Sequence, residues 1–97
     1  MQFSLRHPGV AYIANVTVDP EYRRRGVGRA LVAAAEEEAL SAGGDELRSA
    51  ALHANAGDRG ARALYDGSGY EVVAEDPLFL AALPGRTRRV LMQKALR

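Results

Sequence analysis

The stretch VTVDPEYRRRGVGRAL, residues 16–31, decides the fold of this 97-residue chain. Val16 and Val18 alternate with polar residues, which predicts a strand, and Pro20 ends that strand. From Gly26 onward a long alanine-rich run predicts a helix. The stretch therefore predicts a strand that leads through a basic glycine loop directly into a helix.

The glycine loop has the features of an anion-binding turn. The first turn of a helix has backbone amides without an internal partner, and the helix dipole adds positive potential there. Gly26 and Gly28 let the backbone approach an anion closely, and arginine can donate two parallel hydrogen bonds to phosphate. The arginines around the loop are Arg23, Arg24, Arg25 and Arg29. The loop is therefore predicted to bind a pyrophosphate.

Two better-known phosphate loops do not match this chain. The P-loop requires GxxxxGK[ST], and the sequence contains no Gly-Lys pair. The dinucleotide fingerprint GxGxxG needs a small third residue, where this chain has Leu31. Both classes of nucleotide site are excluded for this loop.

Two spaced patterns in the chain point to one family. The first, V-x-P-x-x-[RQ]-x-x-G-x-[GA], is filled by Val18, Pro20, Arg23, Gly26 and Gly28. The second, A-x-x-L-Y-x-x-x-G-[FY], is filled by ARALYDGSGY at residues 61–70. These patterns resemble motif A and motif B of the GNAT superfamily of N-acetyltransferases. The resemblance covers most of the chain from residue 11 to residue 73.

The resemblance implies a GNAT-like mixed α/β sheet that binds acyl-CoA across the diverging ends of two strands, residues 10–18 and 47–54. Main-chain groups of Val16 and Val18 would bind the pantetheine arm and the thioester carbonyl. The amides of residues 24–29 would surround the pyrophosphate. The implied acetyl-CoA-binding residues are Val16, Val18, Arg23, Arg24, Arg25, Gly26, Val27, Gly28 and Arg29.

The implied reaction moves an acetyl group from acetyl-CoA to a primary amine by direct attack of the amine on the thioester. It needs a stabilised oxyanion, a route for the amine proton and an acid for the leaving thiolate. Tyr65 occupies the position that serves as general acid in many family members. Asp58 stands where the family usually has asparagine; the change suits a helix cap but is unfavourable beside a polyanionic cofactor.

The general base is left unassigned by the sequence. His7 and His53 are candidates because histidine titrates near neutral pH, although a lone strand histidine is more often structural. Tyr12 and Asn15 could orient a water molecule or the acceptor amine. The sequence does not name that acceptor.

Apolar periodicity and turn signals predict the element order β-β-α-β-α-β-β. The expected strands are Met1–His7, Val10–Val18, Leu47–Ala54, Tyr70–Ala74 and Arg88–Ala95. The expected helices are Gly26–Ala42 and Arg59–Ser68, the second capped by Asp58. On the first helix, one apolar face is predicted to hold Val27, Leu31, Ala34, Ala35 and, without explanation, Glu38, with Glu36 and Glu37 pointing elsewhere.

Composition narrows the class of protein. Thirteen basic and twelve acidic side chains give a net charge of +1, which argues against a nucleic-acid partner. The absence of cysteine excludes disulfides, thiolate metal sites and a cysteine nucleophile, and no metal site is predicted. The N-terminus has no signal-peptide pattern, and the longest apolar run, Leu78–Leu83, is too short to cross a membrane. We therefore expect a cytoplasmic protein without a membrane partner.

Residues 1–97 are expected to form a single acyl-CoA-binding domain, truncated or minimal, that lacks the first strand and first helix pair of the complete GNAT fold. The missing sheet neighbours would leave an unpaired edge, which favours a homodimer. Leu78–Leu83 is expected to be core or a dimer contact, or a cover over the acceptor site. The leading function is an N-acetyltransferase; the alternative is a non-catalytic or partner-dependent CoA-binding module.

Overall fold

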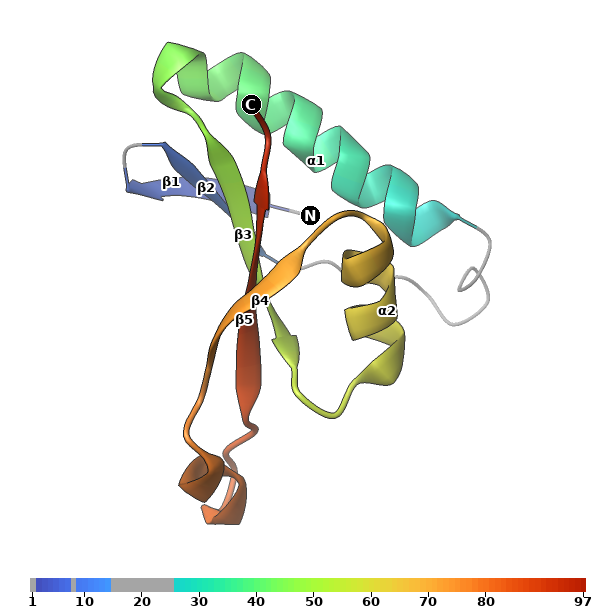
Figure 1. Ribbon diagram of the computed structural model, residues 1–97, viewed down its shortest axis with the longest axis vertical. Coiled ribbons are helices and arrows are strands. Elements are labelled where there is room, and N and C mark those ends of the chain that lie inside the picture. Colours follow the sequence, from blue (N-terminus) through green and yellow to red (C-terminus); the bar gives the residue numbers. More distant parts are fainter. Residues whose placement is uncertain (1, 8, 15–25) are drawn as a thin grey trace.

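The computed structural model describes residues 2–7, 9–14 and 26–97, which form a five-stranded sheet with two α-helices packed on one face (Figure 1). The strands are β1 (Gln2–His7), β2 (Val10–Ala14), β3 (Ser49–Asn55), β4 (Glu71–Glu75) and β5 (Arg89–Ala95). The helices are α1 (Val27–Gly43) and α2 (Arg59–Gly67), with short 3-10 turns η2 (Gly44–Glu46) and η3 (Leu78–Ala82). The predicted element order is confirmed, with boundaries shifted by one or two residues in the described part of the chain.

The strand order in the sheet is β1-β2-β3-β5-β4. β2 and β3 are parallel and are joined by the crossover through α1, whereas the other neighbours are antiparallel. β3 pairs with β5 over seven residues but with β2 over only three. The strand predicted for Val10–Val18 is described as far as Ala14; Val16 and Val18 lie outside the described residues.

The core lies between the sheet and the two helices. Its buried side chains come from both the sheet and the helices. The largest of those that are fully buried are Tyr70, Ile13, Leu47, Leu52, Val32 and Val90. Alternate residues of β3 face this core, because successive side chains of a strand point to opposite faces. None of the helices in the described part of the chain is long and apolar enough to cross a membrane.

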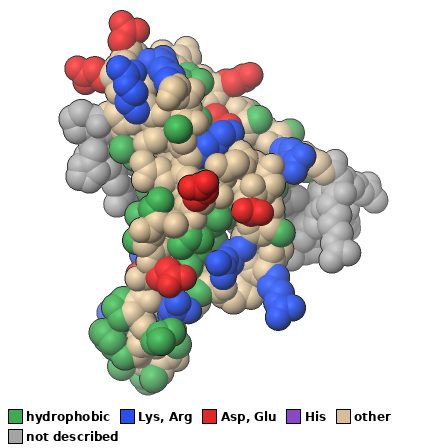
Figure 2. Space-filling model, in the orientation of Figure 1, with side chains coloured by type: hydrophobic (Ala, Val, Ile, Leu, Met, Phe, Trp, Pro, Cys, Tyr) green, Lys and Arg blue, Asp and Glu red, His purple; other side chains and the backbone are tan. Residues whose placement is uncertain are grey.

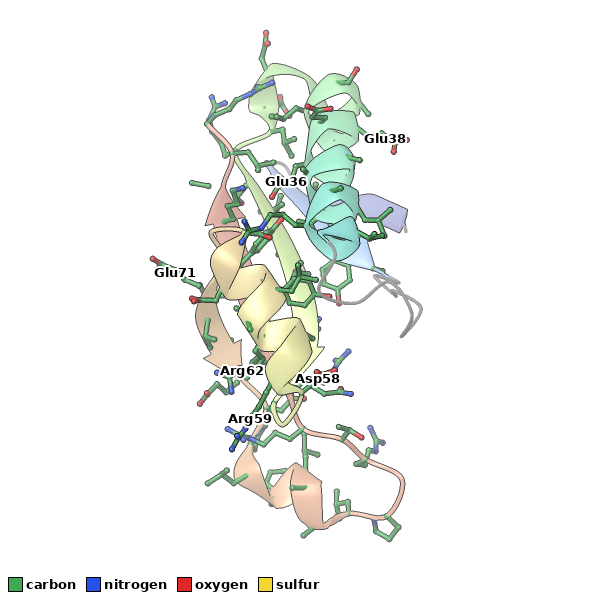
Figure 3. The ribbon with its side chains drawn as sticks, turned by 90° about the vertical axis from the view of Figure 1, so that its right-hand side faces the viewer. Glu36, Glu38, Asp58, Arg59, Arg62 and Glu71 are labelled. Atoms are coloured by element: carbon green, nitrogen blue, oxygen red, sulfur yellow. The ribbon has the colours of Figure 1, made fainter. Side chains whose placement is uncertain are left out.

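The predicted apolar face of α1 is confirmed at Ala35 and wrong at Ala34 and Glu38. The buried residues are Val32, Ala35 and Ala39, whereas Ala34 and Glu38 are exposed. Figure 3 shows Glu38 pointing away from the rest of the molecule and Glu36 turned toward it. Alanine stands on several sides of this helix, so the sequence marks the apolar face weakly and packing against the sheet selects it.

Glu36 joins α1 to β5 and to the residue that precedes β4 through two polar contacts. The buried Tyr70 hydroxyl donates to Glu36 Oε2 at 2.8 Å, and Lys94 Nζ of β5 lies 3.1 Å from Glu36 Oε1. The ammonium is also 5.8 Å from the centre of the Tyr70 ring. Burial, and then the hydrogen bond to Glu36, raises the pKa of Tyr70 far above its usual value. The half-buried carboxylate is therefore stabilised by both a hydroxyl and a cation.

The Leu78–Leu83 segment is not part of the core. η3 lies at the tip of the long β4–β5 connection, far from α1 (Figure 1). Leu78 and Phe79 are 76% and 65% exposed, and Figure 2 shows hydrophobic side chains gathered at this tip. The connection contains two prolines, and the backbone hydrogen bonds given for its tip, from Leu80 to Pro77, Leu83 to Leu80 and Arg86 to Leu83, lie within the tip itself.

We expect Tyr70→Phe to lower the free energy of unfolding by about 1.5–3 kcal/mol, because it removes a hydrogen bond to a charged group in the interior. Urea unfolding at neutral pH measures the change. In a double-mutant cycle with Lys94→Met the two losses should not add, since both contacts converge on Glu36. A loss near zero for Tyr70→Phe would contradict this account of the cluster.

Candidate functional site

The site is built around the point where β2 and β3 separate. The two strands pair only from Val10–Tyr12 to Ser49–Ala51, although β2 continues to Ala14 and β3 to Asn55. A cavity of about 500 Å³ lies beyond the last pair, lined by Tyr12, Ile13, Ala14, Leu52, His53, Ala54, Asn55, Tyr65 and Arg89. Ligand sites of open α/β sheets lie at such ends of parallel strands.

Tyr12 and His53 form a polar pair on one wall of this cavity. Tyr12 stands opposite Ala51 in the parallel register, so His53, two residues further along β3, projects from the same side of the sheet. The Tyr12 hydroxyl is hydrogen-bonded to Nδ1 of His53, and the ring centres are 5.4 Å apart. Both side chains are half-buried. The pair offers the cavity an imidazole that is hydrogen-bonded to a phenol hydroxyl.

Tyr65 reaches the same cavity from α2. The Asp58 carboxylate accepts a hydrogen bond from the Ala61 amide at 3.0 Å and so caps the helix, as predicted. Tyr65 follows two turns later; its ring is buried and meets the Tyr70 ring edge-on, with centres 6.3 Å apart. Burial, and secondly the Asp58 charge, raises the pKa of the Tyr65 hydroxyl above its usual value. Tyr65 is therefore a protonated phenol at neutral pH and can donate a proton.

The glycine loop is described from Gly26 onward. Gly26 precedes α1 with φ of 78°, a left-handed conformation that favours glycine, and a Cβ there would meet none of the described residues within 4 Å. The Ala30 amide donates to Gly26 O at 3.0 Å and closes the first turn. Val27, Gly28 and Arg29 supply first-turn amides, which have no carbonyl partner inside the helix. Such first-turn amides favour an anion, and the predicted pyrophosphate contact at this helix end stays a prediction.

Arg29 is turned toward α2 in this structure. Its Nη2 donates to the Gly67 carbonyl at 3.3 Å, near the C-terminal end of that helix. Its predicted contact with the cofactor phosphates stays a prediction. The other predicted cofactor residues that precede the helix lie outside the described residues: Val16, Val18, Arg23, Arg24 and Arg25.

Pairing of Tyr12 with His53 is the feature of the site that the sequence did not reveal. Each residue was a candidate separately, but 41 positions of sequence divide them. Only the parallel register of β2 with β3 brings them together. Across the described residues, no group of three or more His, Asp or Glu side chains is gathered to hold a metal ion.

Comparisons with known proteins agree with this geometry. The model of the acetyltransferase (GNAT) family matches residues 1–70. GCN5-related N-acetyltransferase 10, chloroplastic, of Arabidopsis thaliana is 37% identical over 90 residues, which are 90% of this chain and 34% of that protein. The chain spans about a quarter to a third of the length of the curated relatives it matches.

Solved structures give the same result. The ribosomal-protein-S18-alanine N-acetyltransferase of Escherichia coli matches with a TM-score of 0.70 and 27% identity, over 91% of this chain and 55% of that one. A GNAT family acetyltransferase of Elizabethkingia anophelis with acetyl-CoA bound shares the fold, with a TM-score of 0.79 and 16% identity, over 97% of this chain and 65% of that one. With a family model matched over most of its length, this chain belongs to the GNAT family of acetyltransferases.

Proposed function

We propose that this chain binds acetyl-CoA and transfers its acetyl group to a primary amine by direct attack of the amine on the thioester. One observation carries the proposal: the cavity between the diverging strands brings Tyr65 together with the Tyr12–His53 pair. A proton donor and a proton acceptor on one cavity are what acyl transfer to an amine requires. Family membership supports the same reaction.

The acyl donor fits the space from the start of α1 to the cavity. The first-turn amides of α1 and the open Gly26 suit the pyrophosphate, and the predicted ligands Val16, Val18 and Arg23–Arg25 belong to the same proposed site. Along the cavity, Ile13 and Ala14 pair with β1 but not with β3. Their strand edge is therefore turned toward the cavity, where an extended arm of the donor could bind as a strand would.

In the proposed reaction, the neutral amine nitrogen attacks the thioester carbonyl carbon, and the C–N bond forms as the carbonyl oxygen becomes an oxyanion. The amine proton passes to the Tyr12 oxygen while the Tyr12 proton moves to His53 Nδ1. Collapse of the intermediate breaks the C–S bond, and the thiolate takes the proton of the Tyr65 hydroxyl. General acid–base steps of this kind contribute about 10²–10⁴-fold to the rate.

We expect Gly28→Asp to weaken acetyl-CoA binding roughly tenfold or more, because it places a carboxylate at the helix end that receives the pyrophosphate. Titration calorimetry with acetyl-CoA measures the effect, and thermal denaturation checks that the variant is folded. Ala34→Asp is the matched control, since Ala34 is exposed two turns further along α1. Equal affinity of the two variants would contradict the proposed donor site.

We expect Tyr65→Phe to lower kcat about 10²-fold while acetyl-CoA affinity changes little, and His53→Gln to lower kcat similarly. Steady-state kinetics across a broad panel of primary amines measures turnover. Tyr70→Phe is the control for loss of a tyrosine hydroxyl outside the cavity, where that hydroxyl donates to Glu36, and kcat is measured under conditions in which urea unfolding shows this variant fully folded. Donor binding without turnover of any amine by the unsubstituted protein would favour the non-catalytic CoA-binding alternative instead.

We also propose that the chain forms a homodimer. β1 and β4 are the outer strands of the sheet, and all five residues of β4 are exposed. Leu78, Phe79 and Leu83 add an exposed apolar surface at the η3 tip. Unpaired strand edges and apolar patches of this kind commonly mark association sites.

The cytoplasmic location stays a prediction, and the names of both curated relatives include the word chloroplastic.

Light scattering at micromolar concentration is expected to give the mass of a dimer for the unsubstituted protein. The double variant Leu78→Ser, Phe79→Ser should shift the population toward monomer, because it removes apolar area from the proposed contact. Ala34→Ser, on the exposed surface of α1, should leave the mass unchanged. A monomeric unsubstituted protein would refute the dimer.

A further inference from the structure

Arg89 gives the cavity a single positive charge at the end furthest from the paired part of β2 and β3. It is the only charged side chain among the described residues that line the cavity. Its Cα lies opposite Asn55, at the start of β5 and the end of β3. The charge therefore lies beyond the Tyr12–His53 pair.

The backbone of Arg89 makes two hydrogen bonds with Asp76, whereas its guanidinium makes only one long contact in the described part of the chain. The Arg89 amide donates to Asp76 Oδ2 at 2.9 Å, and the Asp76 amide donates to the Arg89 carbonyl at 2.9 Å. The guanidinium has one long contact, 3.8 Å from Nε to the same Asp76 oxygen, and the side chain is 50% exposed. Within the described part of the chain its terminal nitrogens make no hydrogen bond. Those nitrogens can donate in parallel to a carboxylate.

The neighbouring arginine is engaged elsewhere. Arg88 Nε donates to the Asp76 carbonyl at 3.0 Å, and its Nη2 lies 3.6 Å from Glu75 Oε2. Arg88 precedes β5 and, unlike Arg89, is not among the described residues that line the cavity. Arg89 is thus the cation that a molecule in the cavity would meet.

The strand register gives the approximate spacing of the groups that an acceptor would present to Arg89 and to the Tyr12–His53 pair. Asn55, the residue opposite Arg89, is two residues beyond His53 on β3. The Cα atoms of His53 and Asn55 are therefore about 7 Å apart along the strand. In an extended peptide, where consecutive Cα atoms are about 3.8 Å apart, a similar spacing separates the free amine from an acidic side chain on the second residue.

We propose that the acceptor is a peptide amine followed by a carboxylate at the second residue, and that Arg89 binds this carboxylate. The assignment rests on the proposed acetyl transfer. It makes Arg89 a specificity-determining residue: the amine lies at the Tyr12–His53 pair and the carboxylate at the guanidinium.

The test compares two peptides with amidated C-termini, Ser-Glu-Ala-Ala and Ser-Gln-Ala-Ala, so that the glutamate side chain is their only carboxylate. The unsubstituted protein should acetylate the glutamate peptide about tenfold more efficiently in kcat/KM, and added salt should reduce this preference. Arg89→Gln should bring the ratio of the two values close to one, and Arg89→Lys should keep part of it. Arg59→Gln, at the exposed start of α2, should keep the full ratio.

A ratio near one in the unsubstituted protein, or a full ratio in Arg89→Gln, would overturn the assignment of Arg89. Small primary amines that carry no carboxylate, assayed in parallel, separate this outcome from failure of the proposed function. If such an amine is acetylated and neither peptide is, the acceptor class is wrong and acetyl transfer stands. If no amine is acetylated by the folded protein, the proposed function itself fails, and the acceptor class with it.

Discussion

The cavity exists because the parallel pairing of β2 with β3 is short. Three residues of each strand are in register before the strands separate, while β3 stays paired with β5 along its whole length. A longer β2–β3 ladder would fill the cavity with backbone hydrogen bonds. The same three pairs also align Tyr12 with His53, so one register creates both the space and the polar pair beside it.

Contacts of α1 and α2 fix the position of Tyr65, the side chain that reaches the cavity from the helices. Asp58 caps α2 and thereby sets where its turns fall, which places Tyr65 against the cavity. Tyr70 supports the Tyr65 ring and is itself tied to α1 through Glu36. The position of the proposed acid is therefore coupled to the helix whose first turn is proposed to receive the pyrophosphate. A small domain gains rigidity from such shared contacts, because its core buries a limited area.

Two charged side chains of α1 make long-range contacts that the sequence pattern does not predict. Glu36 was expected to point away from the core, yet it accepts from Tyr70 and pairs with Lys94. Arg29, whose contact with the cofactor phosphates stays a prediction, donates to a carbonyl of α2. Both contacts join residues more than 30 positions apart, so helical periodicity carries no information about them.

The sequence by itself determined the family, the order of the elements and the start of each helix. The family follows from two motifs with fixed residue spacing, and the elements follow from local chemistry: turn residues end strands and Asp58 caps a helix. The tertiary structure alone decided which face of α1 is buried, that Tyr12 and His53 are partners, and that Arg89 lines the cavity with them. Those relations depend on strand register and on the angle at which helices pack, and neither is encoded in the spacing of residues along one segment.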